Sequence, residues 1–320
     1  MRLFKTIVHY SKRARRSLIA EAIKETWRDP LGKGAIFMLV FFAGLFVLSF
    51  WAPYDYRVQD LEATRQGVSA GHWFGTDLLG RDMFTRVLYA TRPTLILLMM
   101  TVFLGGSALA IILGTWPIFY SKKADFFVQR TSEAIGGMPA LFIIIILTAI
   151  LRPLYDDFIY ESSALGEWVV KTGLADLGLI MFVTALIGWV GPARMYRSMV
   201  LQLREAPFVE RARMLGASRT RILFRHVIPQ LFPYITHATL STLAGVIGTE
   251  IALSFLGIGI RAPHPSFGAM FSESASARLL SSAPHMLLFP ALVVSLFLLG
   301  LRILDIRSTV IIRKKQSGEV

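Results

Sequence analysis

The sequence predicts an all-α integral membrane protein with six transmembrane helices and a basic, amphipathic N-terminal segment. Hydrophobic residues make up 54% of the 320 residues, and charged residues only 17%. A soluble domain is nearer half apolar and a quarter charged. The apolar residues also gather in runs close to the roughly 20 residues with which a helix crosses a bilayer. Basic residues lie between these runs, as they do in multi-span membrane proteins.

The six apolar runs give the expected spans. The third run is the least regular, because Arg130 and Glu133 fall in its first turns, where a spacing of three allows them to pair with each other. The others are almost free of charge in their central turns. The predicted spans are residues 34–52, 93–117, 128–151, 174–193, 231–257 and 284–304.

The net charge of +13 is distributed unevenly between the loops. Lys and Arg gather before the first span, between the second and third, between the fourth and fifth, and after the sixth, whereas residues 151–174 are acidic. Basic residues near a span are retained in the cytoplasm, so both termini are predicted to be cytoplasmic, and an even number of spans agrees. The predicted division is a cytoplasmic leader 1–33, a transmembrane domain 34–304 with an external loop 53–92 and a cytoplasmic loop 194–230, and a cytoplasmic tail 305–320.

Several function classes are disfavoured by the same residues. Basic residues between apolar runs do not form the basic face of a nucleic-acid-binding domain. The sequence has no Cys, and its six His residues show no metal-ligand spacing, so we expect no metal site. Gly32-Lys33 lacks the earlier Gly and the following Ser or Thr of a phosphate-binding loop. We therefore expect no catalytic residues and no cofactor in this chain.

The loop between the fourth and fifth spans carries the most informative pattern, reading REAPFVERARMLGASRTRILFRHVIPQ over residues 204–230. Phe208, Ala212 and Leu215 recur at helical spacing, and Gly216 suits the left-handed residue that closes a helix. A second short helix is expected over residues 221–226, ended by Pro229. Two short helices would form a compact projection that another protein could bind. The alternative is an ordinary amphipathic helix lying on anionic lipid.

This loop resembles the EAA loop of ABC importer permeases, with Glu210, Ala212, Gly216 and Pro229 in register. The resemblance implies the type I permease fold, in which the loop is the coupling helix that docks on a separate ATPase. Arg211 departs from the family, which has a second small residue there, and a long cation needs more room in a docked surface. The resemblance implies an ATPase-coupling set of Glu210, Arg211, Ala212, Gly216 and Pro229.

The family also implies partners. Two ABC ATPase subunits would bind ATP and Mg²⁺, a second homologous permease would complete a heterodimer, and an external substrate-binding protein would deliver cargo, all at a bacterial inner membrane among lipid. The rival class is a self-sufficient secondary transporter, which more often shows internal repeats and several polar residues at mid-membrane.

A second resemblance concerns the segment after the first span, which reads HWFGTDLLGRDMFTRVLYATRPTL over residues 72–95. It is similar to the second membrane subunit of dipeptide, oligopeptide and nickel permeases, and further matches follow in order to about residue 300. The alternative is a capped helix at the membrane interface with a structural role only. Peptide cargo is implied most often, with nickel, metallophores or glutathione as alternatives. The matching residues are Gly75, Thr76, Asp77, Gly80, Arg81, Asp82 and Arg86.

Glu250 lies within an otherwise apolar span, where a carboxylate costs a few kcal/mol unless it faces protein, water or a cation. Glu250 and Ser254, one turn further on, are predicted to line the translocation path. Two alternatives stay open. The carboxylate could pair with a basic residue on a neighbouring helix or subunit, or it could lie at the outer interface.

Overall fold

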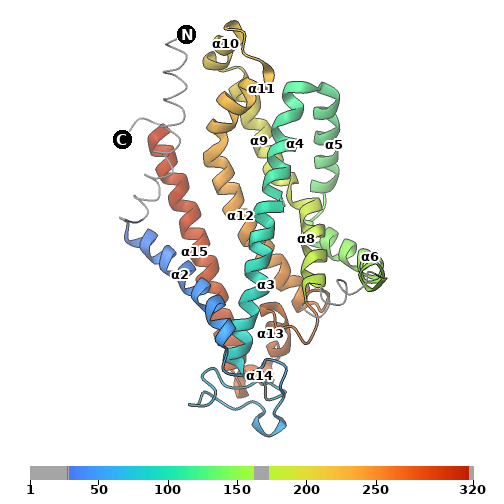
Figure 1. Cartoon of the computed structure of the whole chain (residues 1–320), viewed down its shortest axis with the longest axis vertical. Helices are drawn as coiled ribbons and strands as arrows, with labels where there is room; N and C mark the ends of the chain where they lie inside the picture. The colour runs from blue at the N-terminus through green and yellow to red at the C-terminus, as the bar shows by residue number, and fades with distance from the viewer. Residues whose placement is uncertain (1–26, 28, 105, 162–172, 317–320) are drawn as a thin grey trace.

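The computed structural model describes residue 27 and residues 29–104, 106–161 and 173–316. Most of these residues are helical, and most of the long helices run roughly along the long axis of the molecule (Figure 1). The one isolated bridge between described residues joins Thr76 and Asp82. Most of the predicted basic leader and the last four residues of the predicted tail lie outside the described residues.

The first predicted span forms α2 (Pro30–Leu48) and the short turn η1 (Ser49–Trp51). Asp29 caps α2 by accepting the N–H of Gly32 at 3.0 Å, with Pro30 at the first helical position. The helix lies along α15 (His285–Gln316), which extends well beyond the predicted span (Figure 1). Arg307 of α15 forms a 3.1 Å ion pair with Asp29, so the start of α2 and the end of the last span lie together.

The second predicted span corresponds to parts of α3 (Met83–Leu104) and α4 (Gly106–Tyr120). The fourth forms α8 (Leu174–Gly188) and α9 (Val190–Arg204), which continue one another as a single apolar run over Leu174–Arg204. The helices α4 and α9 pack closely because Gly114 has no side chain; a Cβ there would lie 2.6 Å from the carbonyl oxygen of Ala193. This contact joins the second and fourth spans.

The third predicted span is not a single helix. It forms α5 (Lys122–Gly136) and α6 (Ala140–Glu161), which meet at a 91° bend. The expectation of one helix over residues 128–151 was therefore wrong. Pro139 disfavours helical backbone at the residue before it, and Gly136 and Gly137 add two weak helix formers at the same point. Arg130 and Glu133 do pair, at 3.1 Å, on the exposed face of α5.

Four described helices are long and apolar enough to cross a membrane, and the bent pair of α5 and α6 would make five. The four are Pro30–Trp51, Leu174–Arg204, Tyr234–Phe255 and His285–Ser308. In the region of the predicted second span, Ala108–Tyr120 is a shorter apolar helix.

The remaining elements lie at the two ends of the molecule (Figure 1). One end carries α10 (Pro207–Met214), α11 (Arg219–Ile222) and the α4–α5 connection. From α11 the chain passes through the π-helical turn η3 (Leu223–Val227) into α12 (Ile228–Phe255). The opposite end carries the loop between η1 and α3, including the turn η2 (Leu61–Ala63), with α13 (Phe267–Ser274) and α14 (Ala277–Ser282).

Pro229 does not end the helix before it, as the sequence analysis expected. It lies in the first turn of α12, where a helix needs no N–H from that residue, so the chain continues from α11 through η3 into α12 without a break. The short helices at this end are thereby continuous with a long apolar helix.

Candidate functional site

The candidate site is the hairpin of residues 205–227, built by α10, α11 and η3. Pro207 starts α10 at its first position, and Gly216 ends it with a φ of +78°, a backbone angle that favours glycine. The N–H of Ala217 then reaches back to the carbonyl oxygen of Ala212 at 3.0 Å, which closes the helix end. Ser218 caps α11 by accepting the N–H of Arg221 at 3.3 Å. The sequence prediction for Gly216 is confirmed by this geometry.

One face of the hairpin is buried against the rest of the chain. Val209 and Ala212 are the buried side chains of α10, and they pack in one apolar cluster with Ile222 and Leu223. The ends of α4 and α9 complete this cluster. The apolar repeat that the sequence analysis singled out runs through Phe208, Ala212 and Leu215, but only Ala212 faces inwards. Val209 was missed, although it lies three residues before Ala212 on the same face.

The opposite face exposes apolar side chains at the tip. Met214 is 75% exposed and Leu215 is 71% exposed. Glu210, Arg211 and Gly216 beside them are also exposed. An apolar tip with charged neighbours is unfavourable in water and is typical of a surface that another protein covers. We refer to Glu210, Arg211, Met214, Leu215 and Gly216 as the hairpin tip.

Hydrogen bonds fix the hairpin to α4. The Tyr120 hydroxyl and the Thr220 hydroxyl are 2.6 Å apart, and the Arg219 guanidinium donates to the carbonyl oxygen of Phe119 at 3.3 Å. Arg204, at the end of α9, donates to the carbonyl oxygen of Ile118 at 3.4 Å. The hairpin is therefore bonded to α4, and the chain continues from it through η3 into α12.

Glu250 and Ser254 lie together inside the chain. Glu250 is 2% exposed, and the Ser254 hydroxyl donates to its carboxylate at 2.9 Å and accepts the N–H of Ile260 at 3.1 Å. Backbone from Gly259 and Gly268 lies so close to Ser254 that a Cβ at either glycine would clash with it. Within the described residues no basic side chain forms a salt bridge with Glu250. The pair thus joins the end of α12 to the segment before α13.

The motif after the first span forms a buried ion network at the end opposite the hairpin. Asp77 is fully buried and accepts hydrogen bonds from the side chains of Arg81 and Arg86, and both arginines also contact Glu273 of α13. Asp82 lies 2.9 Å from His72 Nδ1 and accepts the N–H of Thr85 at 2.7 Å. Gly75 and Gly80 have φ of +72° and +73°, and Thr76 is fully buried. Glu273, which lies far along the chain, was not among the residues predicted for this motif.

The described residues contain no cluster of three or more His, Asp or Glu side chains that could hold a metal ion. The family model described as binding-protein-dependent transport system inner membrane component matches residues 106–314, which is more than half of the chain.

The chain belongs to this family. A dipeptide transport system permease protein of Bacillus subtilis is 30% identical over 92% of this chain and 84% of its own length. A glutathione transport system permease protein of Pectobacterium atrosepticum is 30% identical, covering 89% of each chain. An oligopeptide transport system permease protein of Bacillus subtilis is 29% identical over 87% of this chain and 86% of its own length.

The resemblance to ABC importer permeases is thus confirmed, and the chain is a membrane component of a binding-protein-dependent importer. The match includes the whole hairpin and both residues of the Glu250–Ser254 pair, whereas the motif of residues 75–86 precedes the matched segment. The roles of the individual residues stay predictions.

Proposed function

We propose that the chain is one of two permease subunits of an ABC importer for peptides, and that the hairpin tip docks on an ATPase subunit. The observation that carries the docking proposal is an exposed apolar tip, Met214 and Leu215, on a hairpin that is bonded to α4 and continuous with α12. An exposed apolar tip of this kind is typical of a surface that a partner protein or a membrane covers. Its attachments would pass the partner's movement into the membrane helices.

The five residues of the coupling prediction take different parts in this proposal. Glu210, Arg211 and Gly216 are exposed and would meet the ATPase directly, with Met214 and Leu215 added to the contact. Ala212 is buried, and its small side chain would instead let α10 pack closely against the rest of the chain. Pro229 starts α12 and would transmit the movement. Because Arg211 is a long exposed cation, we expect the ATPase surface facing it to be acidic.

The test uses the complex purified from membranes with its ATPases. A double variant, Met214→Asp and Leu215→Asp, is expected to lose the ATPase and to abolish uptake into proteoliposomes, because two carboxylates replace the apolar contact. Leu280→Asp is the matched control: Leu280 is 46% exposed on α14, at the opposite end of the molecule. If the tip variant keeps the ATPase and coupled uptake, the docking assignment is wrong.

The membrane orientation is part of the proposal. We place the hairpin, the α4–α5 connection and both termini on the cytoplasmic side, with α2, α3–α4, α5–α6, α8–α9, α12 and α15 as six crossings. The chain has no Cys, so single cysteines report cleanly on sidedness. A cysteine at Lys122 should react with a membrane-impermeant maleimide only after the cells are opened, and one at Ser69 should react in intact spheroplasts.

Peptide cargo follows from the relatives, which are named for dipeptides, oligopeptides and glutathione. Glutathione is the second candidate, because one of these relatives carries that name. Nickel or a metallophore would be a third. In proteoliposomes with the cognate external binding protein, a labelled tripeptide should be taken up, with glutathione and nickel complexes as the competing cargoes. A secondary transporter would take up cargo without any ATPase.

We also propose that Glu250 and Ser254 belong to the wall of the path and become accessible when the two permeases separate. Both are buried in the single chain, so exposure should depend on the state of the complex. A cysteine at Ser254 is expected to react with a small thiol reagent in only one of the ATP-bound and nucleotide-free states. Equal protection in both states would leave the pair with a structural role.

A further inference from the structure

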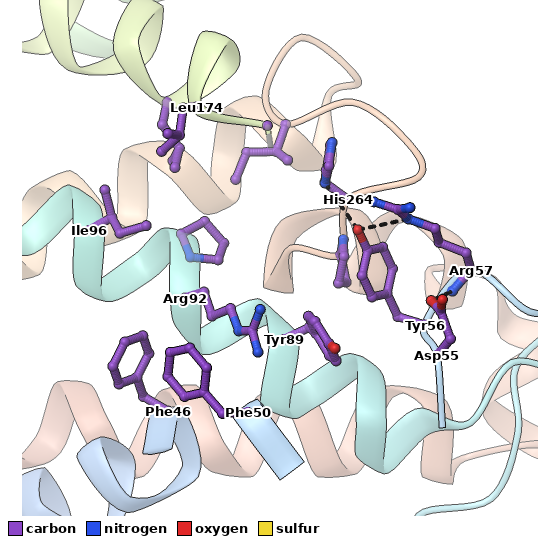
Figure 2. Close-up of a pocket in the computed structure, with 15 residues that line it drawn as sticks. Phe46, Phe50, Asp55, Tyr56, Arg57, Tyr89, Arg92, Ile96, Leu174 and His264 are labelled. Atoms are coloured by element: carbon purple, nitrogen blue, oxygen red, sulfur yellow. Dashed lines mark hydrogen bonds between the residues drawn. The ribbon is translucent and has the colours of Figure 1, made fainter. Parts of the chain in front are cut away.

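A cavity of about 580 Å³ lies at the end of the molecule opposite the hairpin, between η1, α3, the start of α8 and the segment before α13. Figure 2 shows its lining. Phe46, Ile96 and Leu174 lie toward one side of the view, and Asp55, Tyr56, Arg57 and His264 lie toward the other. Arg92 and Tyr89 stand between the two groups. The cavity thus has an apolar half and a polar half.

The two halves are ordered along the direction of the spans. On α3, Ile96 follows Arg92 by one turn towards the middle of the molecule. Phe46 of α2 likewise lies one turn nearer the middle than Phe50 of η1. The polar half is supplied by the loop after η1 and by the segment before α13. The apolar half is therefore the one nearer the middle of the bilayer. A ligand that fits this order has an apolar chain directed inwards and a charged group directed towards water.

Contacts within the chain fix the guanidinium of Arg92 between the apolar and the polar half of the cavity. Its Nε donates to the Ser49 hydroxyl at 2.8 Å and its Nη2 to the Ser49 carbonyl oxygen at 2.6 Å. The guanidinium lies over the rings of Phe50 and Tyr89, at 4.6 and 4.1 Å from their centroids. Its Nη1 has no hydrogen-bond partner among the described residues, so the preorganised group has a donor free for a ligand.

The charge of the polar half favours an anion. Arg92 and Arg57 contribute two guanidinium groups, against the single carboxylate of Asp55. Neither guanidinium forms a salt bridge within the part of the chain that the structure describes. Arg57 Nε donates to the Tyr56 hydroxyl at 3.1 Å, and the Asp55 carboxylate accepts the backbone N–H of Arg57 at 2.9 Å. A guanidinium fork fits the oxygens of a phosphate group, and here two such forks face a single lining carboxylate, that of Asp55.

The apolar half decides which kind of anion fits. Phe46, Ile96 and Leu177 offer no side-chain donor or acceptor. A peptide lying there would leave a backbone donor and acceptor unsatisfied at every residue, whereas a hydrocarbon chain loses nothing. Further along α3, the apolar side chains of Met99 and Val102 are 58% and 42% exposed. From Arg92 to Val102 the helix rises about 15 Å, enough for much of an acyl chain.

We infer that this cavity binds an anionic phospholipid of the leaflet at that end, with its phosphate on Arg92 and Arg57 and an acyl chain along Ile96. The inference concerns lipid alone and does not depend on the cargo or on the ATPase contact. It assigns Arg92 and Arg57 to lipid recognition and Ile96 to the wall of the acyl-chain groove.

The test uses the assembled complex in detergent micelles with phosphatidylglycerol that carries a photoactivatable acyl chain. Crosslinks should map to peptides containing Phe46 and Ile96, and unlabelled phosphatidylglycerol should compete better than phosphatidylcholine. Arg92→Gln is expected to lower the crosslink yield about tenfold, as loss of a charge-assisted hydrogen bond implies. Arg57→Gln should lower it less, because Arg57 is exposed.

Two further variants separate lipid binding from general effects. Ile96→Trp fills the apolar half without changing charge and is also expected to abolish most crosslinking. Arg278→Gln is the matched control, since Arg278 is an exposed arginine on α14 at the same end but outside the cavity, and it should crosslink as the wild type does. If the Arg92→Gln variant fails to assemble, the crosslink yields of Arg57→Gln and Ile96→Trp test the inference in its place. Wild-type yields in all three cavity variants, equal competition by phosphatidylcholine, or displacement of the lipid by a tripeptide would overturn the inference.

Discussion

Asp77 and Arg86 form a buried ion pair that joins the loop after the first span to α3, with both side chains at most 4% exposed. Replacing Asp77 by Ala would leave Arg86 and Arg81 sharing only Glu273. Removal of one partner of a buried pair costs about 3–5 kcal/mol, and we expect the lower end because Glu273 remains. The purified complex should melt several degrees lower, measured by tryptophan fluorescence.

The control for this prediction is Asp157→Ala, which removes an exposed carboxylate from α6. It should leave the melting temperature within about a degree of the wild type, since exposed charges contribute little. Equal melting of the two variants would show that the Asp77 network does not stabilise this end of the molecule.

The sequence identified this motif but not its structural function. The alternative considered for Arg81, Asp82 and Arg86 was a capped helix at the membrane interface with a structural role only. Their burial depends on Glu273, which approaches from α13, 187 residues beyond Arg86. A single sequence carries no signal for a contact between segments so far apart.

Gly216→Ala should weaken the hairpin without creating a steric clash. A Cβ at Gly216 would meet no atom within 4 Å, but its φ of +78° costs an L residue about 1–2 kcal/mol. The end of α10 should fray and displace Met214 and Leu215. We expect lower coupled uptake per ATP hydrolysed, measured in proteoliposomes.

Gly245→Ala is the comparison for Gly216→Ala, because Gly245 has equally open surroundings but lies inside α12 with helical backbone. Alanine there should be neutral or slightly stabilising. A loss of coupling with Gly245→Ala that matched the loss with Gly216→Ala would argue against any special role of the left-handed turn.

His226 should make stability of the hairpin depend on pH. Burial lowers the pKa of His226 below its usual value, and the nearby Arg225 lowers it further. The folded state then binds fewer protons than the unfolded state, so stability is complete above about pH 6.5 and falls as the pH drops below that value. His226→Gln should reduce the fall in melting temperature between pH 7.5 and 5.5. An unchanged pH dependence in this variant would exclude His226 as its source.

The hairpin illustrates what local patterns can and cannot predict. Gly216 predicted the end of α10 correctly. The helix ends there at a residue with positive φ, a backbone angle that favours glycine over other residues. The inward face was misassigned, since Phe208, Val209, Ala212 and Leu215 all fit helical spacing and only the positions of α4 and α9 decide which are covered. Pro229 was predicted to end the helix before it, although proline suits the first turn of a helix equally well.

The bend between α5 and α6 is the largest departure from the sequence prediction, and its geometry can be measured. Because the chain has no Cys, spin labels can be attached at Phe127 and Ile150, which are 71% and 59% exposed. A straight helix would separate their Cα atoms by about 34 Å, whereas two arms at a right angle give about 24 Å. Double electron–electron resonance on the assembled complex should show the shorter distance.

Labels at Leu288 and Ile306 supply the reference distance, because both are exposed on the continuous helix α15. Their separation should be about 27 Å, as the helical rise requires. The variant Pro139→Ala removes the ring that disfavours helix at the preceding residue, while Gly136 and Gly137 remain, so we expect the bend to persist with a broader distance distribution. A wild-type distance near 34 Å would instead support one straight span over residues 128–151, and α6 would then cross the bilayer in line with α5.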